Sequence, residues 1–184
     1  MKVLTTLKRS LSAAVLIAGL ASAPAAVTDF TFLNGFSGAN ESSPNGSIGT
    51  FGINTLQFDD TPATPGPSGL FGTFTLNVTF GGLLGDATAA HIHGLAPVGI
   101  NAAPLQGLTF TPASAGTISG TWAPVSIAEV NGLFAGQTYL NLHSTTFGGG
   151  EWRAQLVTVP EPSTWALLGL GAVGFLYQHR RHRR

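Results

Sequence analysis

Apolar and polar residues alternate along most of the middle of the chain, which predicts short β-strands rather than long helices. The clearest segment is Thr73 to Phe80, in which every second residue is Phe, Leu or Val and the others are Thr or Asn. Successive side chains of a strand point to opposite faces, so one face of this segment is expected to lie in a core. The same alternation occurs in residues 30–36, 49–58, 87–93, 117–122, 138–143 and 151–157, and residues 105–110 add another candidate.

One helix and one long loop interrupt the strand pattern. Ser126 and Glu129 form the Ser-x-x-Glu pattern of a capping box, apolar residues follow at 127, 130 and 134, and Gly136 is expected to end the helix. Asp59 to Gly69 contains three prolines and predicts a surface loop. Seven or eight short strands with one helix predict an all-β fold, an antiparallel two-layer β-sandwich of the immunoglobulin-like or superoxide-dismutase-like type. A closed barrel is the alternative.

The N-terminus has the composition of an export signal. Lys2, Lys8 and Arg9 precede an apolar run over residues 11–20, and small residues follow up to Ala26. We expect a helical signal peptide over residues 1–25, cleaved by signal peptidase after Ala25.

The C-terminus combines a breaker motif, a short apolar segment and a cluster of arginines. Pro160, Glu161 and Pro162 precede an apolar helix predicted over residues 164–177, and a basic tail occupies residues 178–184. The run from Trp165 to Tyr177 spans roughly 20 Å as a helix, against roughly 30 Å for a bilayer core. The expected anchor residues are Trp165, Leu167, Leu168, Leu170, Val173, Phe175, Leu176 and Tyr177, and the basic stop comprises Arg180, Arg181, Arg183 and Arg184. A buried C-terminal helix of a soluble domain is the alternative.

These three elements, in this order, resemble the PEP-CTERM sorting signal of bacterial exported proteins. The resemblance implies a transmembrane helix that anchors the chain transiently in the inner membrane and cleavage near the Pro-Glu-Pro motif by an exosortase. The expected organisation is therefore a signal peptide (1–25), one β domain (26–158) and a sorting signal (159–184).

Removing the two targeting segments changes the charge balance of the chain. Eight Lys and Arg match eight Asp and Glu, but seven of the basic residues lie in the two ends. Residues 27–159 keep only Arg153 against seven acidic residues, which gives a net charge of −6. Such a domain is expected to bind nucleic acid poorly, because phosphate binding needs clustered cations. The chain has no cysteine, which excludes disulfides and thiolate metal sites.

Polar residues recur on the same face of three predicted strands. His91 and His93 share a face, as do Asn141 and His143, and Glu151 and Arg153. A hairpin of the last two strands would place Asn141 opposite Arg153, with Glu151 opposite His143. Two interpretations follow: a zinc or copper site formed by His91, His93, His143 and Glu151, or a structural hydrogen-bond network formed by Asn141, Glu151 and Arg153.

Four blocks of the middle region together resemble the CHRD domain. They are Ser37 to Glu41, Ala89 to Gly94, Tyr139 to His143 and Gly149 to Gln155, in the family's order over roughly residues 29–157. The family's Glu-Val-Pro-Pro after the first block is here Glu41-Ser42-Ser43-Pro44. The resemblance implies a β-rich extracellular module and supplies no reaction.

We therefore expect an exported, non-enzymatic protein of the cell envelope or extracellular matrix, without a cofactor, that interacts with exopolysaccharide in a biofilm or with another surface protein. The alternative is a metal-dependent (zinc or copper) oxidoreductase resembling superoxide dismutase. That alternative requires His91, His93 and His143 to converge within ligand distance.

Overall fold

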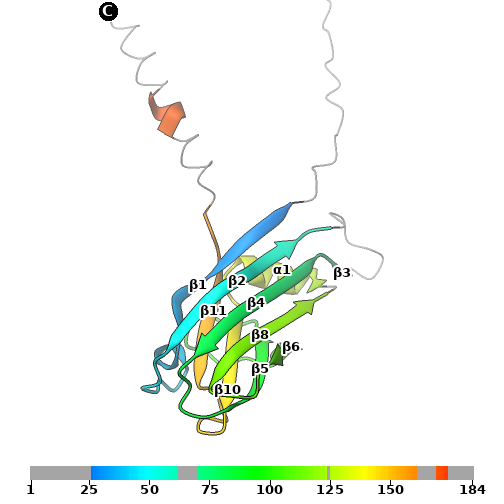
Figure 1. Ribbon diagram of the computed structural model, residues 1–184. Helices are drawn as coiled ribbons and strands as arrows, with labels where there is room; N and C mark the ends of the chain where they lie inside the picture. The colour runs from blue at the N-terminus through cyan, green and yellow to red at the C-terminus, as the bar shows by residue number, and fades with distance from the viewer. Residues whose placement is uncertain (1–25, 62–69, 124, 161–168, 174–184) are drawn as a thin grey trace, which may run out of the picture.

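The structure is a computed structural model that describes residues 26–61, 70–123, 125–160 and 169–173 (Figure 1). Strands dominate these residues, as the sequence predicts. They are β1 (Val27–Ser37), β2 (Thr50–Asp59), β3 (Leu70–Phe71), β4 (Thr73–Gly81), β5 (Ala87–His93), β6 (Pro104–Gly107), β7 (Thr109–Phe110), β8 (Ala115–Trp122), β9 (Val125–Ser126), β10 (Tyr139–Ser144) and β11 (Trp152–Thr158). A 3-10 turn η1 (Gly38–Asn40) follows β1, and a helix α1 (Ile127–Phe134) precedes β10.

Within the described part of the chain, nine strands form one antiparallel sheet in the order β6-β5-β10-β11-β1-β2-β4-β8-β7. The strand β1 joins its two halves, because residues near Val27 pair with β2 whereas Phe30 to Ser37 pair with β11. The ladder to β11 is interrupted after Leu33, where Asn34 and Gly35 both have positive φ angles, 60° and 77°. This bulge bends β1 within the part that pairs with β11, whereas the change of partner from β2 to β11 occurs earlier, between Asp29 and Phe30.

The two edges of the sheet meet through a single residue. β6 pairs with β5 at one edge and β7 pairs with β8 at the other, and only Leu108 separates β6 from β7. The Leu108 amide donates to the Ala90 carbonyl over 2.9 Å, which draws the edges together. The all-β prediction is confirmed, and the sheet is nearly closed. The sandwich type is not confirmed, because the main strands belong to one curled sheet instead of two stacked sheets.

The core lies inside the curled sheet and follows the alternation seen in the sequence. Phe74, Leu76, Val78 and Phe80 of β4 are all buried, and the intervening polar residues are partly exposed. The helix α1 contributes Val130 and Leu133 to the core. The exposed ring of Phe134 covers the edge of this core, with edge-on contacts to Phe30 and Phe58 at 5.5 and 5.6 Å. The predicted capping box is present: the side chain of Ser126 accepts from the Glu129 amide, and that of Glu129 accepts from the Ser126 amide.

The outer face of β10 and β11 is covered in part by the loop of residues 96–102, whereas His91 of β5 and His143 of β10 stay partly exposed. Gln155 donates to the Ala96 carbonyl, and the guanidinium of Arg153 donates to the carbonyls of Pro97 and Ile100. Tyr139 is bonded to the backbone of Ala102 in the same loop. This loop therefore buries the polar side chains of Tyr139, Arg153 and Gln155, and its Ala102 carbonyl contacts His93.

The targeting segments are described only in part. The predicted signal peptide (1–25) lies outside the described residues, as do residues 62–69 of the predicted Pro-rich loop and most of the predicted anchor. Residues 169–173 of the anchor are helical, with Leu170 and Val173 exposed. Among the described residues, no helix has the length and apolar character needed to cross a membrane.

Candidate metal centre

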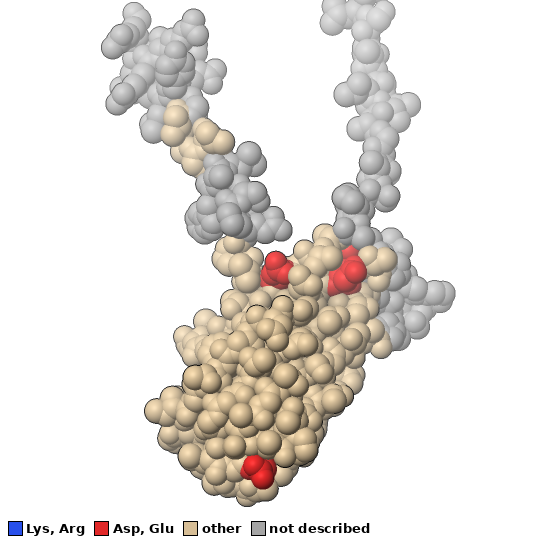
Figure 2. Space-filling view, in the orientation of Figure 1, with Lys and Arg blue, Asp and Glu red and all other residues tan. Residues whose placement is uncertain are grey.

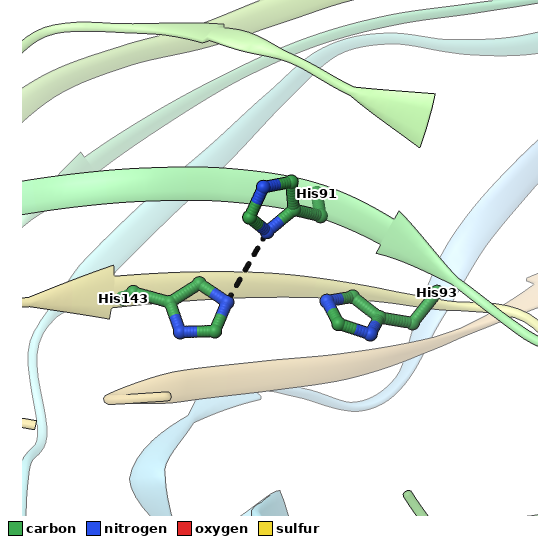
Figure 3. A group of neighbouring side chains, drawn as sticks. All are labelled: His91, His93 and His143. Atoms are coloured by element: carbon green, nitrogen blue, oxygen red, sulfur yellow. Dashed lines mark hydrogen bonds between the residues drawn. The ribbon is translucent and has the colours of Figure 1, made fainter. Parts of the chain in front are cut away.

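Two adjacent strands bring three histidines together on the outer face of the sheet. His91 and His93 are two residues apart on β5, so their side chains share a face. Asn141 of β10 is paired with His91, which places His143 diagonally across from it. One ring nitrogen from each histidine lies within 4.8 Å of the others (Figure 3). The convergence that the metal alternative requires is therefore present.

Backbone carbonyls orient two of the three rings. The Nδ1 atom of His93 lies 2.9 Å from the Ala102 carbonyl oxygen, and that of His143 lies 2.9 Å from the Gly148 carbonyl oxygen. A carbonyl only accepts, so Nδ1 carries the proton in each ring and Nε2 keeps a free lone pair. The Nε2 atom of His93 is buried and has no hydrogen-bond partner in the described structure. Metal-ligating histidines show this arrangement, with one nitrogen held by an acceptor and the other presented to the ion.

His91 and His143 lie at a spacing that suits a bound ion between them. Nδ1 of His91 lies 3.3 Å from Nε2 of His143, drawn as a dashed line in Figure 3. Two nitrogens that bind one tetrahedral zinc at about 2.0–2.1 Å lie about 3.3 Å apart. Without an ion, His91 donates to His143 across this gap. An ion placed there would take both lone pairs, and the His91 proton would move to Nε2.

The surroundings favour the neutral form of two of these rings. Burial lowers the pKa of His91, and the neighbouring His143 adds to that effect. Burial also lowers the pKa of His93, partly opposed by its hydrogen bond to Ala102 and reinforced by His91, His143 and Arg153. Only a neutral imidazole offers a lone pair to a metal ion, so these shifts favour ligation.

Tyr139 connects the histidines to the single buried cation. Its ring stacks on that of His93 with centroids 5.0 Å apart and an angle of 16°. The guanidinium of Arg153 lies 3.5 Å from the centre of the same Tyr139 ring. The Tyr139 hydroxyl accepts from the Ala102 amide at 2.9 Å, beside the carbonyl that holds His93. Tyr139 therefore fixes both the plane of His93 and the position of its acceptor.

The carboxylate of Glu151 lies away from the histidines. It is fully buried, and its Oε1 atom accepts from the hydroxyl of Ser47 at 2.5 Å and from the Leu84 amide at 2.6 Å. Glu151 precedes β11 and follows Gly150, whose φ of 132° turns the chain. The structure therefore does not bring Glu151 into the histidine cluster.

Arg153 and Asn141 are cross-strand partners, as the sequence predicts, and Tyr139 is likewise opposite Gln155. Arg153 is 1% exposed, and the described hydrogen bonds of its guanidinium go to neutral oxygens of Asn101, Gln155 and the loop backbone. Burial lowers the pKa of Arg153, an effect opposed by Tyr139 and Glu41. The acidic group that acts on Arg153 is therefore Glu41, whereas Glu151 of the predicted network accepts from Ser47 and Leu84.

Glu41 is a buried acidic residue that the strand pattern did not single out. It is 6% exposed, and burial raises its pKa to about 7 against the opposing effects of the Arg153 charge and of hydrogen bonds from Asn141 and the Ser42 backbone. Oε1 of Glu41 and Oδ1 of Asn141 both lack hydrogen-bond partners in the described structure. A Cβ added to Gly150 would lie 2.7 and 2.6 Å from these two atoms, so they face the same small space. The raised pKa favours a protonated Glu41 carboxyl in this space, where no donor in the described structure reaches either oxygen.

The exposed formal charges of the described chain are all negative, because its only Lys or Arg is the buried Arg153. The face seen in Figure 2 accordingly carries patches of acidic side chains and no basic ones. The three histidines are the only group of three or more His, Cys, Asp or Glu side chains in this part of the chain that converge closely enough to hold a metal ion. Three imidazoles without a thiolate or carboxylate suit zinc or copper.

Two family models match the chain. The CHRD domain matches residues 32–156, and the PEP-CTERM protein-sorting motif matches residues 158–181. No curated protein and no solved structure matches. The sorting motif marks an exported protein that is anchored in the membrane during sorting, processed by an exosortase-type enzyme and then released to the surface. The larger match covers more than half of the sequence, and the chain therefore belongs to the CHRD domain family.

Proposed function

We propose that the sorted protein is a non-enzymatic, metal-binding component of the cell envelope or extracellular matrix, and that it holds one Zn²⁺ or Cu²⁺ ion on His91, His93 and His143. The convergence of three imidazole nitrogens within 4.8 Å carries this proposal. The sorting motif supports a role at the surface, in interactions with exopolysaccharide of a biofilm or with other surface proteins.

Each histidine would have a distinct part in binding the ion. His93 and His143 would supply Nε2, held in place by the Ala102 and Gly148 carbonyls, and His91 would supply Nδ1. The ion would thereby join β5 and β10 and hold the two loops that carry those carbonyls. A bound ion would also give a partner to the buried Nε2 atom of His93, which has no hydrogen-bond partner in the described structure.

Metal content of the full chain, produced with export, tests the proposal. His179 and His182 of the basic tail would first be replaced by Ala, so that the tail contributes no ligand. We expect one Zn²⁺ or Cu²⁺ per chain by elemental analysis and calorimetry, and loss of that ion in the His91→Ala/His143→Ala variant. Thr88→Ala is the matched control, because Thr88 is exposed on the same strand outside the cluster. A chain that stays folded and metal-free during titration would overturn the proposal.

A second candidate function is the oxidoreductase that resembles superoxide dismutase. The observation in its favour is that His91 and His143 are only half-buried, which leaves room for a small molecule at the ion. The copper-loaded chain would be assayed for superoxide dismutation beside its His143→Ala variant. Activity that exceeds that of free copper and disappears in the variant would establish the enzyme and contradict the non-enzymatic proposal.

A further inference from the structure

Resting on the metal site proposed above, we propose that the three-histidine centre takes an external carboxylate as its fourth ligand. The chemical class of the ligand is a carboxylate anion, either a free organic acid or the uronate groups of an acidic polysaccharide. Four observations support this proposal: the charge of the ligand set, the absence of an acidic group at the cluster, the open space beside His91, and the distribution of charge over the domain.

The ligand set leaves the charge of the ion uncompensated. All three donors are neutral imidazoles, and no Asp or Glu of the described residues joins the group. Glu151, the acidic residue nearest in the predicted pattern, is occupied by Ser47 and Leu84. A divalent ion held by three neutral ligands keeps its full double charge and keeps a coordination position for an anion or water.

Glycines leave open space on two sides of the cluster. Gly107 of β6 is the cross-strand partner of His91, so a side chain at this position would stand on the same face as the His91 ring. A Cβ added to Gly107 would have no atom within 4 Å, and the same holds for Gly148 and Gly149 in the turn beyond His143. These positions therefore leave space beside the partly exposed rings of His91 and His143, where a small anion would meet no side chain of the three glycines.

The charge distribution favours an anion at this position and disfavours it elsewhere. Arg153, the single cation of the described chain, lies over Tyr139, which in turn stacks on His93. The remaining charges on the described surface are acidic and repel anions. Among the described residues, a bound ion with Arg153 behind it would be the one exposed positive centre, which favours carboxylate binding at that position.

Cobalt(II) is the probe for this test, because its visible absorption reports the identity and number of its ligands. The full chain, with the tail histidines replaced as above, would be loaded with Co²⁺ and titrated with galacturonate, polygalacturonate, galactose and a neutral polysaccharide. We expect a saturable spectral change with the two acidic ligands and none with the two neutral ones. A response to galacturonate alone assigns the ligand to small organic acids, and a response to both acids extends it to polysaccharide.

Gly107→Val separates this inference from the metal site itself. Gly107 has no positive φ, so Val fits the strand, and its side chain would fill the space beside His91 without removing a metal ligand. We expect unchanged Co²⁺ binding and at least tenfold weaker galacturonate binding, whereas Gln106→Val on the other face of β6 should change neither. Co²⁺ binding with no response to any carboxylate would overturn this inference and leave the metal site standing. Failure to bind Co²⁺ would overturn the metal site as well.

Discussion

At the scale of single residues, the most consequential group outside the histidine cluster is the carboxyl of Glu41. Burial raises its pKa to about 7 from an ordinary value of 4.5, so the folded chain binds this proton more tightly than the unfolded chain does. The stability that the proton supplies is complete below pH 4.5 and is lost as the pH rises through about 7.

Glu41→Gln tests this proton directly, because the amide keeps the neutral shape at every pH. The free energy of unfolding of the wild type, relative to the variant, should fall by about 2 kcal/mol between about pH 5 and pH 8. Taking the difference between the two chains cancels the opposite contributions of His91 and His93, whose pKa values are lowered. Denaturant titrations across that range provide the measurement, and a difference that does not vary with pH would contradict a buried proton on Glu41.

At the scale of elements, α1 depends on its capping box because it is short. Ile127–Phe134 is an eight-residue helix, and a helix of this length is not stable alone in water. The cap satisfies two backbone N–H groups that the helix itself leaves without partners. α1 in turn places Val130 and Leu133 in the core, so the cap contributes to one end of that core.

Ser126→Ala should therefore lower the free energy of unfolding by about 1 kcal/mol. The variant loses the oxygen that accepts from the Glu129 amide and changes no core contact. Denaturant titration would measure the loss, with Thr121→Ala, at an exposed position on β8, as the matched control. Equal stabilities of the two variants would mean that the cap makes no net contribution.

At the scale of the whole molecule, closure of the sheet depends on the segment around Leu108. The Leu108 amide is bonded to Ala90 of β5, while the flanking strands β6 and β7 pair with opposite edges. Leu108→Pro removes that donor and should cost about 3 kcal/mol, with faster amide exchange in β5 and β8. Leu108→Ala keeps the donor and serves as the control. Unchanged exchange at both edges in the proline variant would show that closure does not depend on this hydrogen bond.

Metal binding should also stabilise the whole molecule, since the ion would join two strands and two loops. At a free Zn²⁺ concentration of about one hundred times the dissociation constant, mass action predicts a gain of about 3 kcal/mol. Thermal denaturation should show a higher midpoint for the wild type with zinc, and no shift for the His91→Ala/His143→Ala variant. Equal shifts in both chains would place the zinc elsewhere.

The sequence predicts those parts of the structure that depend on alternation. The strand of residues 87–93 has the bounds of β5, and the pairing of Asn141 with Arg153 follows from the same phase. Pairing over longer distances leaves no such pattern: nothing in the alternation indicates that β1 serves both halves of the sheet. The alternation does not predict the position of the Glu151 side chain, because Gly150 turns the chain with its positive φ before β11 begins. The carbonyls of Ala102 and Gly148, which orient two histidines, could not be found from sequence, since every residue offers one.

The single buried cation has a consequence for the life of the protein outside the cell. Proteases of the trypsin type cleave after lysine and arginine, and between residue 26 and residue 160 the sequence offers them only Arg153. That residue lies within β11 at 1% exposure, beneath the loop that contains Pro97 and Ile100. The folded domain thus presents no accessible cleavage site to such enzymes. Digestion can begin only when β11 leaves the sheet, and the rate of cleavage at Arg153 would measure how often the domain opens.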